Sequence, residues 1–167
     1  MDKPQLIHFG EKIKLDEKDK AILTLLHHNA RMPISQISRK TGIQRDSVMY
    51  RIKRMERLHV IRSHTSILNP SVLGYPIYSY VSFVLHNIDE ETEKSFVQFL
   101  VSNTQITYVA KVSGKWDYEI VIAAKNLEDF ENTLKRIRYK YSSIIRNYDS
   151  SAIIQEYKFD YLVDLIP

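Results

Sequence analysis

The spacing of hydrophobic positions changes after residue 58. Before it, apolar residues recur every three to four positions, as in amphipathic helices, and cap and breaker residues divide the stretch. We expect helices over 16–28, 33–41 and 45–58, with Asp16 capping the first and Asp19 as its capping-box partner. The β-branched run over 60–67 favours a strand, which could form the wing of a winged helix.

A connector over residues 68–76 follows, marked as a boundary by two prolines and a glycine. Beyond it, alternating polar and apolar residues predict strands over 77–85, 106–112, 117–124 and 146–157. Helical spacing predicts helices over 89–102 and from Asn126 to about Tyr141. The fold class is therefore α+β: an N-terminal winged helix-turn-helix domain followed by a ferredoxin-like βαββαβ domain.

A ferredoxin-like sheet carries helices on one face only, and the other face is expected to be apolar here. The alternation places these residues on the open face: Tyr78, Tyr80, Val84, Val109, Val121, Ile153 and Tyr157. A monomer rarely leaves so large an apolar and aromatic surface uncovered. We therefore expect a second subunit to cover it.

Residues 34–57 have the outline of a helix-turn-helix. Gly42 supplies the residue without a Cβ that a tight turn between helices favours. Val48, Ile52 and Met55 define the packing face of the 45–58 helix. The opposite face and the residues beside it are rich in cations, which predicts contacts to phosphates and base edges in the major groove. The candidate DNA-binding residues are Arg45, Asp46, Met49, Tyr50, Arg51, Lys53, Arg54 and Arg57.

The alternative interpretation of this surface is an ordinary solvated helix face, on which charges of both signs alternate. Between residues 39 and 62, however, basic residues greatly outnumber the two acidic ones, Asp46 and Glu56. The whole chain follows the same division, with a net charge of +7 over residues 1–66 and −3 over 67–167. This pattern indicates a polyanion-binding module joined to a domain with a different role.

The composition excludes several classes of protein. The 167 residues contain no cysteine, which rules out disulfides, thiolate zinc sites and cysteine nucleophiles. No apolar run approaches the roughly 20 residues of a membrane span, and the first residues lack the apolar core of a signal peptide, so we expect a cytoplasmic protein. No catalytic or metal-binding motif occurs, and His27 and His28 point about 100° apart on a helix. We expect no cofactor and no enzymatic activity.

Together, these features resemble the Lrp/AsnC family of transcription regulators. The matching segments are Leu15–Asp19 with Ile22–Leu23, Asn29–Arg31, Gly42–Ile43, Val48, Arg51–Ile52, Met55–Glu56, Val60–Ile61, Asn69–Pro70, Leu73–Gly74 and Val112–Tyr118. The chain departs from the family pattern at Gln44, His59 and Trp116. The expected organisation is an arm over 1–14, a DNA-binding domain over 15–67, a linker over 68–76 and an effector-binding and oligomerisation domain over 77–167.

The resemblance implies a sequence-specific, DNA-binding homodimer. Members of the family often assemble further into tetramers or octamers, and their second domain usually senses an amino acid or similar small effector. It places the effector-binding residues at a turn and at the last strand: Ser113, Gly114, Trp116, Asp117, Ser150 and Ser151. Two alternatives stay open. One is an enzyme similar to sirohaem decarboxylases, in which His64, His86 or the tyrosines would line a tetrapyrrole pocket. The other is a DNA-organising protein without an effector.

Overall fold

The computed structural model describes residues 12–157, 164 and 166, so residues 1–11 of the predicted arm lie outside the described part. The chain divides into two compact units, with the boundary between Ile67 and Leu68. Each unit has its own hydrophobic core and is described by itself. None of the described helices is long and apolar enough to cross a membrane.

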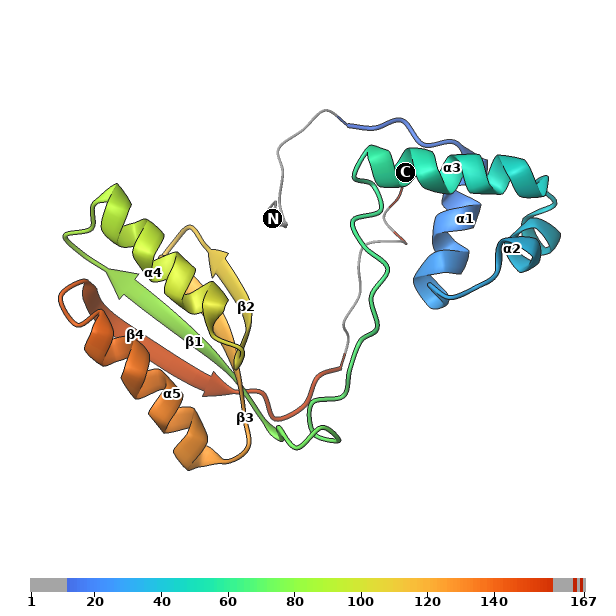
Figure 1. Ribbon diagram of the computed structural model, residues 1–167. Coiled ribbons are helices and arrows are strands. Elements are labelled where there is room, and N and C mark those ends of the chain that lie inside the picture. The colour runs from blue at the N-terminus through green and yellow to red at the C-terminus, as the bar shows by residue number, and fades with distance from the viewer. Residues whose placement is uncertain (1–11, 158–163, 165, 167) are drawn as a thin grey trace. The chain divides into compact units, whose positions relative to one another are not determined.

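The first unit is built from three helices, α1 (Glu17–His28), α2 (Ile34–Thr41) and α3 (Arg45–Arg57) (Figure 1). Asp16 caps α1, and the predicted capping box with Asp19 is present. Gly42 follows α2 in the left-handed conformation, with φ of 70°, and thereby turns the chain into α3. The core of this unit consists of buried residues from all three helices and the turn: Ile22, Leu26, Ile37, Ile43, Val48 and Met55.

The predicted wing strand over 60–67 is wrong, because residues 60–67 form no strand. Its first two β-branched side chains, Val60 and Ile61, pack against the helical core instead. Both of their backbone N–H groups donate to the carbonyl of Met55 at the end of α3. Farther along, His64 Nε2 lies 3.0 Å from Glu56 Oε1. Contacts with α3 therefore fix the segment at these points, whereas the strand of a wing would pair with another strand.

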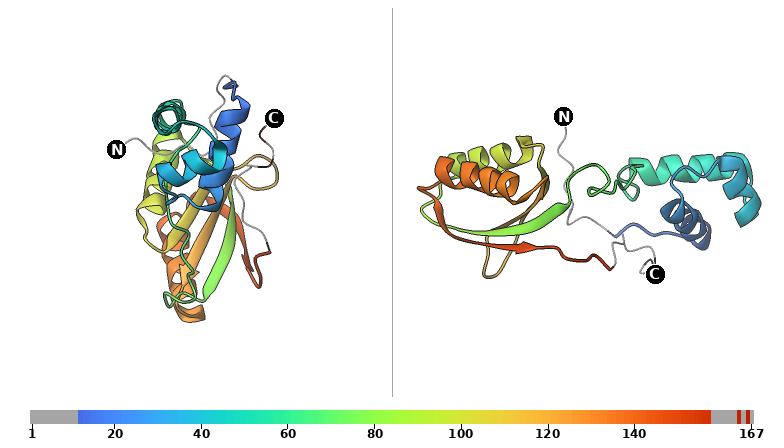
Figure 2. Two further views of the ribbon diagram at one scale, coloured as in Figure 1. Left: turned by 90° about the vertical axis from the view of Figure 1, so that its right-hand side faces the viewer. Right: turned by 90° about the horizontal axis from the view of Figure 1, so that it is seen from below.

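The second unit has the predicted ferredoxin-like order. Its elements are β1 (Ile77–Leu85), α4 (Glu90–Ser102), β2 (Ile106–Lys111), β3 (Tyr118–Ala124), α5 (Leu127–Lys140) and β4 (Ile145–Ala152). The strands form one antiparallel sheet in the order β2-β3-β1-β4. Both helices cover the same face of this sheet, as the right-hand view of Figure 2 shows.

Aromatic rings fill the layer between the sheet and its two helices. Phe96 of α4 is fully buried at the centre of this core. Its ring makes edge contacts with Phe83, Tyr118 and Tyr141, at centroid distances of 5.9, 5.5 and 5.1 Å. Such geometry aligns the positive ring edges with the negative ring faces and stabilises the core beyond the area it buries.

The open face of the sheet carries aromatic and apolar side chains beside polar ones, since Ser82, on the same face as Tyr80, pairs with Glu119 and Asp149. Its apolar part also differs from the predicted set. Val109 packs against the helix-covered core, because an irregularity in β2 between Ile106 and Tyr108 shifts the alternation by one residue. Tyr108 takes its place on the open face, opposite Val121 and 39% exposed. Tyr80, also on this face, is 45% exposed.

The last strand is shorter than the predicted 146–157. β4 ends at Ala152, and the backbone N–H of Ile153 donates one more bond to the carbonyl of Tyr78. The neighbouring strand β1 begins at Ile77, directly after Pro76, which has no N–H to donate. Residues beyond this point lose their partner strand, so Tyr157 lies outside the sheet and is largely exposed.

Candidate nucleic-acid interface and effector site

Helix α3 has one buried and one exposed face. Val48 and Met55 are fully buried and fix the helix on the core of the first unit. Opposite them, Met49 is 40% and Tyr50 64% exposed. Six of the eight predicted DNA-binding residues share this exposure: Arg45, Asp46, Met49, Tyr50, Lys53 and Arg57.

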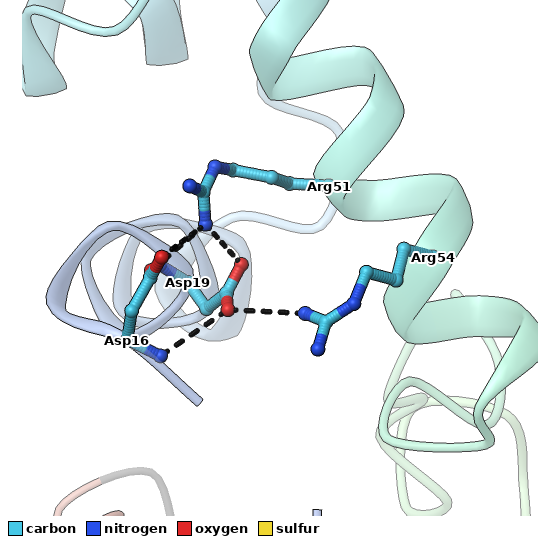
Figure 3. A network of polar contacts seen from close by, with 4 residues as sticks. All are labelled: Asp16, Asp19, Arg51 and Arg54. Carbon is cyan, nitrogen blue, oxygen red and sulfur yellow. Dashed lines mark hydrogen bonds and ion pairs between the residues drawn. The ribbon is translucent and has the colours of Figure 1, made fainter. Parts of the chain in front are cut away.

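The structure separates Arg51 and Arg54 from those six. Nη1 of Arg51 donates to both carboxylate oxygens of Asp16 and to Oδ1 of Asp19, each at 2.8 Å. Nη1 of Arg54 donates to Oδ2 of Asp19 at 3.2 Å. Figure 3 shows both arginines reaching from α3 to the start of α1. Their guanidinium groups therefore pair with carboxylates of the chain itself.

The electrostatic effect of this network is mutual. The backbone N–H of Asp19 and the Arg51 guanidinium hold the pKa of Asp16 below its ordinary value. The two carboxylates in turn raise the pKa of Arg51. Asp19 is only 1% exposed, so its carboxylate is solvated by hydrogen bonds from Arg51 and Arg54 rather than by water.

Sequence analysis identified Asp16 and Asp19 as capping residues but missed them as partners of the arginines. A signal was present in the spacing, because Asp19, Ile22 and Leu26 follow each other at intervals of three and four and form the buried stripe of α1. A carboxylate on a buried stripe requires a cation or several hydrogen-bond donors. The helical wheel of α3 gives the direction of each arginine but not the element that it meets.

Three cations of α3 have a different environment. No ion pair or side-chain hydrogen bond joins Arg45, Lys53 or Arg57 to another residue within 12–157. Their long side chains are exposed, together with Asp46, on the surface that also carries Tyr50. Such a surface offers donors to phosphate oxygens and base edges, and apolar atoms to thymine methyl groups. Its chemistry is that of a DNA-binding helix.

The predicted effector residues lie at two places in the second unit. Ser113 and Gly114 are exposed in the turn between β2 and β3, where Gly114 has a φ of 127°. Trp116 is half-buried, and the Lys115 ammonium lies 4.6 Å from its ring centroid. The turn thus presents small side chains, backbone groups and one aromatic ring.

Asp117 connects this turn to the middle of the sheet. Its Oδ2 accepts a 2.7 Å hydrogen bond from the backbone N–H of Leu85, at the end of β1. Its backbone N–H donates to the carbonyl of Phe83, and its carbonyl accepts from Val112. Asp117 is therefore a structural link between β1 and the turn, whatever else it binds.

Within one chain, the two parts of the predicted effector set are not brought together. Ser150 pairs with Val81 and Ser151 with Tyr80, whereas Asp117 bonds to β1 farther toward its end. Strand β1 also lies between β3 and β4 in the sheet. No group of three or more histidine, aspartate or glutamate side chains suited to a metal ion occurs among the described residues.

A helix-turn-helix with a cationic second helix, joined to a separate ferredoxin-like domain, defines a DNA-binding regulator. Family models identify both parts: an AsnC-type helix-turn-helix domain over residues 15–56 and an Lrp/AsnC ligand binding domain over residues 80–163. The chain belongs to the Lrp/AsnC family of transcription regulators.

Individual relatives agree with this assignment. The HTH-type transcriptional regulator FL11 of Pyrococcus furiosus is 31% identical over 123 residues, which cover 74% of this chain and 80% of FL11. The structure is similar to that of LrpC from B. subtilis, with a TM-score of 0.75, 25% identity and coverage of 87% and 99%. A transcriptional regulator from Neisseria meningitidis in complex with L-Met has a TM-score of 0.82 at 17% identity, covering 92% and 100%. The family models and FL11 are described as transcriptional regulators or their domains, so the alternative of an enzyme similar to sirohaem decarboxylases is not favoured.

Proposed function

We propose that this regulator binds duplex DNA in the cytoplasm by placing the exposed face of α3 in the major groove. The observation that carries the proposal is the row of exposed cations on α3 that pair with no other described residue. Arg45, Asp46, Met49 and Tyr50, near the start of the helix, would meet base edges, and Lys53 and Arg57 would meet phosphates. The domain proposed to bind is residues 15–67.

The test is a salt titration of the full-length protein on a duplex selected from a random pool. Lys53→Ala and Arg57→Ala should each lower the slope of log affinity against log salt by roughly 0.9. The matched control is Lys94→Ala, an exposed lysine on α4. Substitutions at Asp46, Met49 or Tyr50 should instead alter the preferred sequence. Unchanged slopes and preferences would remove α3 from the interface.

The second unit is proposed to form a homodimer through its open sheet face. Support comes from the exposed rings of Tyr80 and Tyr108, which flank Val121 on that face. Tyr80→Glu should convert the dimer to monomers in sedimentation experiments. Tyr139→Glu, the same substitution on the outer surface of α5, should leave the dimer intact. Equal behaviour of the two variants would contradict the proposal, and larger species would indicate the tetramers or octamers expected for the family.

An amino acid is proposed as the effector, bound between neighbouring dimers at the 113–117 turn with Ser150 and Ser151 contributed by another subunit. The separation of the two sets within one chain supports a site that requires a second copy. The Neisseria meningitidis regulator, which shares the fold, holds L-Met. Because Asp117 uses Oδ2 toward the sheet, its Oδ1 would accept the effector's ammonium group.

Calorimetric titration of the full-length protein with the twenty amino acids tests this site. Asp117→Asn keeps an oxygen acceptor for Leu85 but removes the charge, so it should abolish binding of the effector while leaving the sheet intact. If no amino acid binds the unmodified protein at about 10 mM, where the affinity is only a few kcal/mol, the proposal of an amino-acid effector is refuted.

A further inference from the structure

The acidic residues at the start of α1 neutralise part of the charge of the DNA-binding helix. Helix α3 carries five cations, of which Arg51 and Arg54 are paired with Asp16 and Asp19. The two arginine side chains are only 20% and 29% exposed, and the Asp19 carboxylate is 2% exposed. These four residues therefore form a cluster next to the exposed cations of the same helix, and within it only the Asp16 side chain is largely exposed, at 55%.

The cluster is held in place by the backbone of α1. The N–H of Asp19 donates to Oδ1 of Asp16 at 2.9 Å, and the N–H of Asp16 donates to Oδ2 of Asp19 at 3.3 Å. The first turn of a helix thus fixes the position of both carboxylates before any ligand arrives. A DNA phosphate would have to displace carboxylates already bound at 2.8 Å and leave Asp19 buried without its partners.

We propose that Asp16 and Asp19 withhold Arg51 and Arg54 from DNA phosphates and so lower the affinity of the regulator for non-specific DNA. The inference rests on the proposed function of α3. Non-specific affinity increases with each cation that reaches a phosphate, whereas specificity comes from base contacts. Withholding two cations therefore increases the ratio of specific to non-specific binding, which determines occupancy of a true site among many competitors.

The decisive variant is Asp16→Asn in the full-length protein. Asparagine caps helices as well as aspartate, so α1 should keep its N-terminus while Arg51 loses one of its two carboxylates. We expect several-fold tighter binding to a duplex without the selected site, and a salt slope steeper by up to about 0.9. Asp89→Asn is the matched control, because Asp89 caps α4 in the same way and pairs with no arginine within residues 12–157.

Two further variants test whether the tighter binding comes from release of Arg51 or only from the loss of a negative charge near DNA. Arg51→Gln should leave the salt slope on non-specific DNA unchanged, whereas an arginine that contacts phosphate would lower it by roughly 0.9 when removed. In Asp16→Asn combined with Arg51→Gln, the gain in non-specific affinity should disappear. If the gain persists, it reflects only the loss of a negative charge near DNA, and the proposal is overturned.

A purely structural role of the cluster predicts a different result. Loss of a tie between α1 and α3 would weaken specific and non-specific binding together and lower the thermal midpoint, which also checks that each variant folds. Weaker or unchanged non-specific binding by Asp16→Asn, or a reduced slope for Arg51→Gln, overturns the inference. Failure of the unmodified protein to bind any duplex would instead overturn the proposed function.

Discussion

Replacement of Asp117 with alanine should destabilise the second unit by about 2 kcal/mol, although the residue lies in a turn. The alanine removes the acceptor of the 2.7 Å bond from the backbone N–H of Leu85. Hydrogen bonds to charged acceptors contribute about 1.5–3 kcal/mol, and the N–H left behind at the end of β1 adds a desolvation cost. Asp117→Asn should cost less than about 1 kcal/mol, because its amide oxygen can accept the same bond.

Urea unfolding, monitored by tryptophan fluorescence, measures how much each substitution lowers the free energy of unfolding. The chain has a single tryptophan, Trp116, next to the substituted residue, so the signal reports on this turn. With a slope of about 2 kcal/mol per molar urea, Asp117→Ala should lower the midpoint by about 1 M. The protein concentration must be equal in all samples, because association adds to the apparent stability.

The control is Asp149→Ala on β4, because this carboxylate accepts a hydrogen bond from the adjacent backbone N–H of Ser150 and from no other group within residues 12–157. Its midpoint should stay within about 0.3 M of the unmodified protein, since exposed substitutions usually change stability by less than about 0.5 kcal/mol. An Asp117→Ala midpoint as high as that of Asp149→Ala would refute the assignment of Asp117 as a link between the turn and β1.

Three further predictions concern the core, the interhelical turn and acid stability. Phe96→Ala should lower the free energy of unfolding by about 3–5 kcal/mol, because its fully buried ring touches three others; a loss below about 1 kcal/mol in urea unfolding would contradict this packing. Gly42→Ala should cost about 1–2 kcal/mol, because φ is +70° although no atom lies within 4 Å of the new Cβ; calorimetry should show that Gly42→Asn costs less, and equal stability of both would refute the strain. Hydrogen bonds from Lys111 and Tyr118 lower the pKa of Glu93 below its ordinary 4.5. These bonds therefore stabilise the folded state fully above the ordinary pKa, and the stabilisation is lost as the pH falls through the lower pKa of Glu93 in the folded protein. In urea unfolding, Glu93→Gln should show a smaller loss of stability than the unmodified protein between about pH 6 and about pH 3.

Most element boundaries could be predicted because local chemistry determines them. Asp16, Asp89 and Asn126 each cap the helix that follows, and each cap is visible in the sequence as a short polar residue before a periodic stretch. The predicted strand 77–85 is confirmed residue for residue as β1. Local signals of this kind need no knowledge of the rest of the fold.

The errors arose where a distant partner decides the structure. The β-branched segment after α3 has strand propensity, yet the apolar core of the first unit binds Val60 and Ile61 instead. Val109 changed faces because β2 contains an irregularity that alternation alone does not reveal. The structure separates Arg51 from the exposed DNA-binding candidates for the same reason, because its guanidinium group binds Asp16, thirty-five residues away in the sequence.

The outer strand β4 has a consequence for how this domain can aggregate. Its sequence, from Ile145 to Ala152, is mostly polar and charged, and it lies at one edge of the sheet. An edge that carries residues such as Arg146 and Asp149 is a poor template for strands of other chains, and the irregular register between β1 and β4 weakens it further. An assembly formed through the open face of the sheet can be complete after a few subunits. Addition of strands at a sheet edge, by contrast, can continue without limit. Addition of further strands at the β4 edge of this domain is therefore disfavoured.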